Sequence, residues 1–293
     1  MKSFDGVFTA LITPFSGGEI DFDSLKRLVR FQLDNKINGF VISGTTAESP
    51  VLTDREREKI FSFVKSEVAG QVPLIVGTGT NSTQSTIEFS REAEKWGADA
   101  LLTVTPYYNK PPQRGLVEHF KAVAKAVSVP VILYNVPSRT ITSLSLDTIK
   151  TLSEADNIIG IKEASGDVEF GRSIYQKCGS NFLITSGDDG TWLQLCSVGG
   201  RGTISVLSHL IPGRMVEQLE QLRRREPGVM QEAEKYNDLI KLLFIEANPI
   251  PVKAALKMMG IIKSEELRLP LVPLAAEYRE PLKRALERLE IQP

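Results

Sequence analysis

Short, nearly continuous apolar runs recur along the chain, separated by longer amphipathic stretches. A parallel strand that is covered on both faces produces such a run, whereas a half-exposed strand alternates apolar and polar residues. The pattern therefore predicts eight buried strands, at residues 7–13, 39–43, 73–77, 100–105, 129–135, 158–163, 182–185 and 202–206.

The stretches between these runs have the period of a helix. Within residues 21–35, the positions that form one apolar stripe at helical spacing are Leu25, Leu28, Val29 and Leu33. The next helix begins with Thr53 and Glu56, in the spacing of a capping box that satisfies two free amides at a helix start.

Strand followed by helix, repeated eight times, favours an α/β protein with a closed (β/α)8 barrel, the TIM barrel. The alternative is an open doubly wound sheet, which usually carries a glycine-rich dinucleotide-binding turn after a strand. Neither residues 187–190 nor residues 199–202 have the spacing of that turn, so the barrel is the favoured fold.

The pattern changes after the eighth strand. Residues 212–225 predict the last barrel helix, and only helical patterns follow, at residues 229–246, 251–259 and 277–290. We therefore predict a (β/α)8 barrel catalytic domain over residues 1–226 and a C-terminal helical domain over residues 227–293.

Composition and charge exclude several classes of function. The 293 residues are 42% hydrophobic and 24% charged, which is typical of a globular protein, and no apolar run is long enough to span a bilayer. A net charge of −1 gives no basic footprint for nucleic acid. Two cysteines and two histidines fit neither a disulfide framework nor a metal motif, so we expect a cytoplasmic protein without a metal site.

The active site of a TIM barrel forms at the carboxyl ends of its strands. Polar residues that follow the predicted strands are therefore the candidates for chemistry. They lie at residues 43–49, 103–109, 134–140, 162–163 and 186–189.

Lys162 is the least expected of these residues, because it stands inside an apolar run. One interpretation is an ion pair with Glu163 or Asp188. The other is an amine nucleophile that forms a Schiff base with a ketone, since burial of a lysine favours its neutral form. Schiff-base chemistry also needs a proton shuttle and a carboxylate clamp, for which Tyr134 and Arg139 are candidates, although a packed aromatic and a surface arginine remain open.

Five segments together resemble the dihydrodipicolinate synthase family of the N-acetylneuraminate lyase superfamily. They read LTVTPYYN, LYNVPSRT, GIKEA, SGDD and NPIPVK, and they begin at residues 102, 133, 160, 186 and 248. The resemblance implies a class I aldolase-type lyase that condenses pyruvate with aspartate-4-semialdehyde, giving 4-hydroxy-tetrahydrodipicolinate for lysine and diaminopimelate biosynthesis. It also implies no metal or organic cofactor, and a homotetramer built from two tight dimers.

The resemblance implies a catalytic role for four residues. Lys162 forms the imine with pyruvate, and Tyr134 relays protons at that imine. Thr45 passes the proton on toward Tyr108, which enters the site of the neighbouring subunit.

Four further residues are implied to bind substrate. Thr46 binds the pyruvate carboxylate with its hydroxyl and amide, and Arg139 receives the carboxylate of the semialdehyde. Gly187 and Ile204 line the pocket through their backbones.

Two positions depart from the family pattern. Ala47 replaces the usual glycine, which would cost about 1 kcal/mol if the backbone there needed positive φ. Ser85 replaces the acidic residue of the site at which lysine inhibits many family members, so we predict insensitivity to lysine.

Other functions stay open at this level. N-acetylneuraminate lyase and 2-keto-3-deoxy-sugar-acid aldolases share the lysine, the tyrosine and pyruvate, but the residues 137–139 favour the synthase. A non-catalytic ligand-binding barrel is the alternative from another class.

Overall fold

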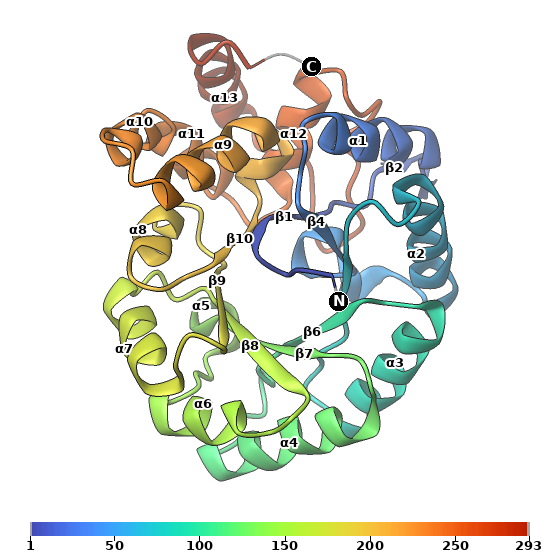
Figure 1. The fold of residues 1–293 in the computed structure, drawn as a ribbon. Helices are drawn as coiled ribbons and strands as arrows, with labels where there is room; N and C mark the ends of the chain where they lie inside the picture. The colour runs from blue at the N-terminus through green and yellow to red at the C-terminus, as the bar shows by residue number, and fades with distance from the viewer. Residues whose placement is uncertain (1, 292–293) are drawn as a thin grey trace. The chain divides into compact units, whose positions relative to one another are not determined.

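The computed structural model describes residues 2–291, and its eight parallel strands form a closed barrel (Figure 1). Each predicted apolar run overlaps one of these strands, so the predicted fold class is confirmed. In barrel order the strands are β1 (Gly6–Ala10), β10 (Gly202–Ser205), β9 (Leu183–Ser186), β8 (Ile158–Glu163), β7 (Val131–Asn135), β6 (Ala100–Val104), β5 (Leu74–Gly77) and β4 (Gly39–Ile42).

In the described part of the chain, thirteen α-helices follow the strands or extend the chain beyond them. None of the helices within residues 2–291 combines the length and the apolar character that crossing a membrane requires. Their bounds are α1 Phe22–Asp34, α2 Asp54–Val68, α3 Thr83–Trp96, α4 Gln113–Ala126, α5 Pro137–Thr140, α6 Leu146–Ser153, α7 Val168–Cys178, α8 Trp192–Ser197, α9 Pro212–Arg223, α10 Val229–Glu234, α11 Asn237–Leu243, α12 Ile250–Met258 and α13 Ala276–Arg288.

Two local predictions need correction. The first apolar run ends as a strand at Ala10, and an unpredicted antiparallel hairpin, β2 (Phe15–Ser16) and β3 (Glu19–Ile20), follows it. The helix predicted over residues 229–246 is two helices, α10 and α11. The capping box at the start of α2 is confirmed, because the Thr53 and Glu56 side chains each accept a hydrogen bond from the other's backbone amide.

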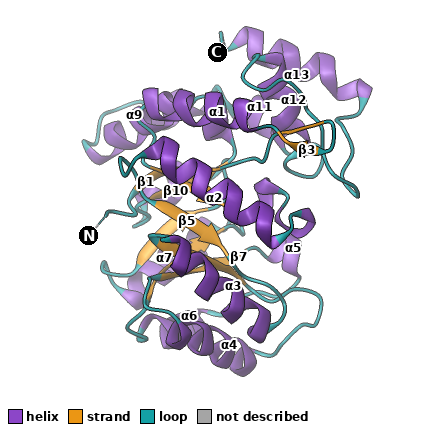
Figure 2. Ribbon diagram, turned by 90° about the vertical axis from the view of Figure 1, so that its right-hand side faces the viewer, coloured by secondary structure: helices purple, strands orange, loops and turns teal. Residues whose placement is uncertain are grey.

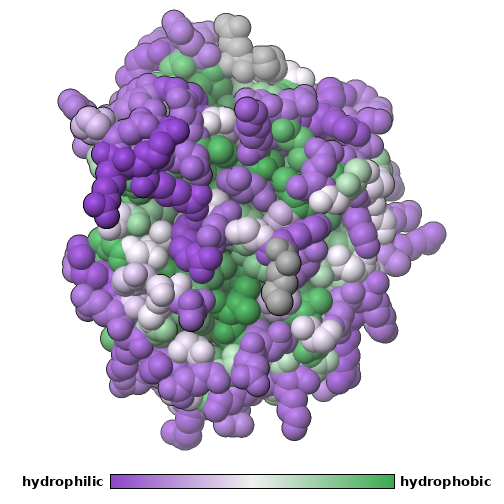
Figure 3. All heavy atoms as spheres, in the orientation of Figure 1, coloured by the Kyte–Doolittle hydropathy of each residue, from purple (hydrophilic) through white to green (hydrophobic). Residues whose placement is uncertain are grey.

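The chain divides into two compact units, of which the first comprises Met1–Gly6 and Pro73–Ile204 and the second Val7–Val72 and Ser205–Pro293. The boundary that the sequence predicts at residue 226 stays a prediction. In the first unit, helices α3, α4, α6 and α7 lie outside the strands (Figure 1). Hydrophilic residues cover the outward side of this unit where α4 and α6 lie (Figure 3).

A fully buried ion pair joins distant parts of the second unit. The Lys253 ammonium, on α12, bonds the carboxylate of Glu48 and also donates to the Glu266 carbonyl at 2.8 Å. Burial lowers the pKa of Lys253 to about 8, against the opposing effect of Glu48. Removing either partner would leave a buried charge uncompensated, so the pair ties α12 to the loop after β4.

The β2–β3 hairpin is held by the same C-terminal segment. The Glu266 carboxylate accepts hydrogen bonds from the amides of Gly17 and Gly18, each at 2.7 Å. The Phe15 ring lies 4.4 Å from the Lys253 ammonium and 4.4 Å from the Arg268 guanidinium. Figure 2 shows β3 on the same side of the molecule as α12 and α13. The hairpin therefore covers the buried charges with an aromatic ring.

His209 is a further buried titratable group of this unit. Its Nε2 accepts the Ile12 amide at 3.2 Å, so its proton lies on Nδ1, 2.9 Å from the Val206 carbonyl. Burial lowers the pKa of His209 from 6.5 to about 4. The folded protein therefore holds this imidazole neutral in a single tautomer.

We predict that the low pKa of His209 decreases the free energy of unfolding as the pH drops from about 6.5 to about 4. In this range the imidazole binds a proton in the unfolded chain but not in the folded protein. The resulting loss of folding stability is about 3 kcal/mol at most. His209→Gln should show a smaller loss of melting temperature between about pH 7.5 and about pH 5 than the parent protein. Ile149→Val, a core change that keeps both histidines, is the control, and an equal loss in His209→Gln and the parent would refute the prediction.

Candidate active site

A lysine and a tyrosine face each other across two neighbouring strands of the first unit. Tyr134 of β7 is in register with Lys162 of β8, so both side chains lie on the same face. The Lys162 Nζ lies 4.3 Å from the centroid of the Tyr134 ring, and the two residues are only 7% and 8% exposed. The arrangement presents an amine beside an aromatic ring that carries a hydroxyl, shielded from bulk water.

Gly187 leaves the space that the lysine side chain occupies. A Cβ at this position would lie 2.6 Å from the Lys162 Cε and 2.6 Å from the Ala164 Cβ, which is shorter than carbon atoms tolerate. The Gly187 amide donates to the Glu163 carbonyl at 2.7 Å, which fixes the backbone at this position. Ile204 is buried in β10 of the same unit.

The two carboxylates that could have paired with Lys162 have other partners. Glu163 accepts hydrogen bonds from the Asn135 side-chain amide at 2.8 Å and from the Ser165 backbone amide at 2.7 Å. Asp188 accepts the amide and the hydroxyl of Thr191, both at 2.9 Å. Burial raises the pKa of Glu163, and these hydrogen bonds oppose the rise. The local geometry thus favours the nucleophile interpretation of Lys162 over the ion pair.

The structure places Arg139 and Tyr108 at exposed positions of the first unit. Arg139 lies on α5, the short helix that begins two residues after β7. Tyr108 follows β6, is 86% exposed, and has a φ of 72°, which is uncommon for a residue with a side chain. A side chain this exposed does not reach the buried Lys162 of its own chain.

Thr45 and Thr46 belong to the second unit, in the 3₁₀ turn η1 (Thr45–Ala47) that follows β4. Thr45 is half-buried, and Thr46 is buried with its hydroxyl accepting the Asn248 side-chain amide at 2.9 Å. Ala47 does not have positive φ; the left-handed residue is Glu48, with a φ of 56°. Alanine at position 47 therefore brings none of the backbone strain that its replacement of glycine suggested.

Sequence analysis did not predict the hydrogen-bond partners of four buried polar residues near these loops. They are Asn135, Glu163, Asn248 and Lys253. Asn135 and Glu163 lie within the polar stretches that the sequence singled out, but the contact between them depends on strand register. The other two belong to the NPIPVK segment, which supported the resemblance but received no structural role.

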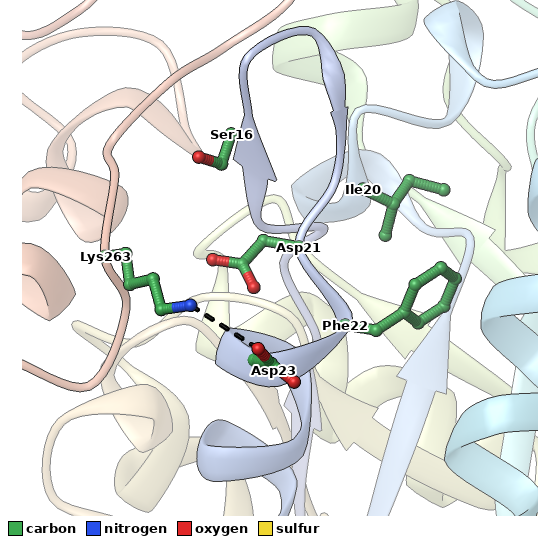
Figure 4. Close-up of a pocket in the computed structure, with 6 residues that line it drawn as sticks. All are labelled: Ser16, Ile20, Asp21, Phe22, Asp23 and Lys263. Carbon is green, nitrogen blue, oxygen red and sulfur yellow. Dashed lines mark hydrogen bonds and ion pairs between the residues drawn. The ribbon is translucent and has the colours of Figure 1, made fainter.

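A separate hollow of about 350 Å³ lies in the second unit (Figure 4). Its two carboxylates already have partners, because Asp21 caps α1 through Ser24 and Asp23 pairs with the Lys263 ammonium at 3.4 Å. It contains none of the predicted site residues. Within residues 2–291, no group of three or more histidine, cysteine or acidic side chains is arranged to hold a metal ion.

Comparisons with known proteins identify the family to which the chain is similar. The sequence profile of the Dihydrodipicolinate synthetase family matches residues 3–289. The 4-hydroxy-tetrahydrodipicolinate synthase of Bdellovibrio bacteriovorus is 53% identical over 99% of this chain and 100% of its own length. A chloride-inhibited dihydrodipicolinate synthase from Acinetobacter baumannii, solved with pyruvate, has a TM-score of 0.96 and 42% identity over 99% of this chain and 100% of that one. A monomeric dihydrodipicolinate synthase variant has a TM-score of 0.96 and 42% identity, covering 98% and 97% of the two chains.

We predict that Gly187→Ala displaces the Lys162 side chain. One extra methyl group in a packed site typically costs about 1–3 kcal/mol, so the yield of a pyruvate adduct reduced by borohydride should fall at least about fivefold. The matched control is Gly115→Ala on α4, where a Cβ would meet nothing closer than 3.6 Å. Equal adduct yields from the two variants would contradict the packing argument.

Proposed function

This chain belongs to the dihydrodipicolinate synthetase family, and from that premise we propose that it condenses pyruvate with aspartate-4-semialdehyde to give 4-hydroxy-tetrahydrodipicolinate. It is a Schiff-base-forming lyase of lysine and diaminopimelate biosynthesis. Full-length relatives named 4-hydroxy-tetrahydrodipicolinate synthase, at 53% and 46% identity, support this activity. The observation that carries the mechanism is the buried Lys162 amine under the Tyr134 ring.

Lys162 forms the covalent bond to substrate. Its neutral amine attacks the ketone carbon of pyruvate, and loss of water gives a protonated imine. The positive imine nitrogen then accepts the electron pair that is left when the pyruvyl methyl group loses a proton. The resulting enamine is the carbon nucleophile that attacks the aldehyde. The chain's own side chains suffice for this sequence of steps.

Hydroxyl groups move the protons. Tyr134 exchanges protons with the imine, and Thr45 passes them on toward Tyr108, provided that each hydroxyl lies within hydrogen-bond reach of the next. The position of the Tyr134 ring beside the Lys162 amine supports its role in proton transfer.

Two groups bind the substrate carboxylates. The Thr46 hydroxyl accepts from Asn248, so its own proton remains to be donated to the pyruvate carboxylate. Arg139 binds the semialdehyde carboxylate, for which its planar fork of donors is suited. Gly187 and Ile204 line the pyruvate site through their backbones. These assignments follow the family motifs residue by residue.

We also propose a cytoplasmic homotetramer of two tight dimers, in which Tyr108 enters the neighbouring subunit. The 86% exposure of Tyr108 supports a role outside its own chain. A monomeric variant among the relatives shows that the fold itself does not require assembly.

The function is tested by trapping the imine. With pyruvate and borohydride the parent protein should gain one reduced pyruvyl mass, and Lys162→Ala should gain none, because it lacks the amine. Lys121→Ala, which removes an exposed lysine of α4, is the control. Tyr134→Phe should still fold and lose about 10²–10⁴ in turnover, the usual contribution of general acid–base catalysis. An adduct on Lys162→Ala would disprove the assignment.

The role of Tyr108 is tested by mixing inactive subunits. Hybrids of Tyr108→Phe with Lys162→Ala should recover part of the activity, because one site in each hybrid dimer receives both an intact lysine and an intact tyrosine. Mass spectrometry of the intact complexes establishes that hybrids form. Hybrids without any recovered activity would show that Tyr108 acts within its own chain.

Lysine is expected not to inhibit this enzyme at millimolar concentration. Ser85 stands where a carboxylate would face the ligand's ammonium, a contact typically worth about 1.5–3 kcal/mol, so binding weakens about 10- to 150-fold. Asp54, at the start of α2, is an acidic residue that could substitute for the missing carboxylate. Its exposed side chain instead pairs with Arg57 at 2.8 Å. Initial rates across a lysine titration at saturating pyruvate measure this, and half-inhibition below about 1 mM would prove the prediction wrong.

A further inference from the structure

Two polar side chains are buried behind the Lys162–Tyr134 face of the first unit. Asn135 and Glu163 stand one residue further along β7 and β8, in register with each other, so they occupy the opposite face of the strands. They are 1% and 2% exposed, and the Asn135 Nδ2 donates to the Glu163 Oε2 at 2.8 Å. Burying polar groups this deeply costs folding free energy unless their hydrogen bonds are made. The hydrogen-bond partners of Asn135 and Glu163 therefore indicate the role of the pair.

The hydrogen bonds of this pair run in one direction. The Leu144 backbone amide donates to the Asn135 Oδ1 at 3.0 Å. A backbone N–H can only donate, so the Asn135 carbonyl must face Leu144 and its NH₂ group must face Glu163. Glu163 in turn must supply an acceptor to Asn135, while its other oxygen accepts the Ser165 amide. A carboxylate at 163 and an amide at 135 are thus required together.

The segment held by these bonds is the one that carries Arg139. Residues 136–144 leave β7 directly after Asn135, form α5, and return to the Asn135 side chain at Leu144. One side chain therefore joins the two ends of this loop, and Glu163 fixes that side chain to β8. Within the loop, the Thr140 hydroxyl donates to the Thr142 carbonyl at 2.7 Å, so the turn after α5 is also constrained.

We propose that Asn135 and Glu163 are positioning residues for Arg139, and so determine how well the enzyme binds the carboxylate of its aldehyde substrate. This proposal rests on the function proposed above. Glu163 is not a catalytic residue: it faces away from Lys162, and both of its oxygens accept other hydrogen bonds. It acts at a distance, by holding the loop whose arginine meets the second substrate.

Isosteric exchange of acid and amide tests the direction of the bonds. Glu163→Gln leaves one oxygen for two donors, the Asn135 NH₂ group and the Ser165 amide, so one of them faces an NH₂ group whichever way the new amide is turned. Flipping the Asn135 amide only moves the conflict to the Leu144 amide. Asn135→Asp sets carboxylate against carboxylate. Each single variant should raise KM for aspartate-4-semialdehyde at least about tenfold, the factor that corresponds to about 1.4 kcal/mol. The kcat and the yield of the borohydride-reduced pyruvate adduct should stay within about twofold of the parent, which is about 0.4 kcal/mol.

The double variant Asn135→Asp with Glu163→Gln reverses the acid and the amide. In this variant the new amide at position 163 donates to the new carboxylate at position 135, which still accepts the Leu144 amide. KM for the semialdehyde should therefore return to within about threefold of the parent, or about 0.7 kcal/mol. Thr142→Val is the control within the loop, because the buried Thr142 hydroxyl has no hydrogen-bond partner; its KM should equal that of the parent.

Hydrogen exchange gives a second measurement that does not depend on turnover. The single variants should exchange faster in residues 136–145 than the parent, with α4 and α7 unchanged. The proposal is overturned by a double variant that stays as impaired as the singles, by a change in adduct yield in place of KM, or by faster exchange throughout the chain. If the parent itself formed no adduct, the proposed function would fail, and the positioning role with it.

Discussion

The register between β7 and β8 is the constraint on which the candidate site depends. Side chains alternate along a strand, so pairing Tyr134 with Lys162 also pairs Asn135 with Glu163 on the other face. A slip of one residue in either strand would bring a carboxylate or an amide against the reacting amine. The same pairing thus places the Lys162 amine beside Tyr134 on one face and the hydrogen-bonded Asn135 and Glu163 on the other. Gly187 completes the first of these faces by leaving the volume that the lysine fills.

The sequence was sufficient for the architecture, and it singled out Lys162 as the candidate for chemistry. Apolar runs report burial on both faces of a strand, which is why all eight barrel strands were predicted, and a lysine within such a run is conspicuous. Hydrogen-bond partners were not predictable in the same way, because they depend on register and on loop geometry. Asn135 and Glu163 lie 28 residues apart, and Leu144 lies nine residues from Asn135. Nothing in a period of two or 3.6 residues identifies such contacts.

The C-terminal region has a part in the second unit that its helical pattern alone does not indicate. Asn248 bonds the hydroxyl of Thr46, and Lys253 forms a buried ion pair with Glu48, so both ends of one short turn are held by residues 248–253. The helices after the barrel therefore support the loop that carries Thr45 and Thr46.

The same ion pair has a consequence for how the protein is made. Lys253 leaves the ribosome 205 residues after Glu48, which takes about 10–40 s at about 5–20 residues per second. Throughout that interval Glu48 has no ammonium group with which to form an ion pair, and the Thr46 hydroxyl lacks the side-chain amide of Asn248. The turn after β4 therefore stays hydrated on the nascent chain, although its strand has long been synthesised. The turn that carries Thr46 therefore reaches its folded contacts only after residues 248–253 have been synthesised.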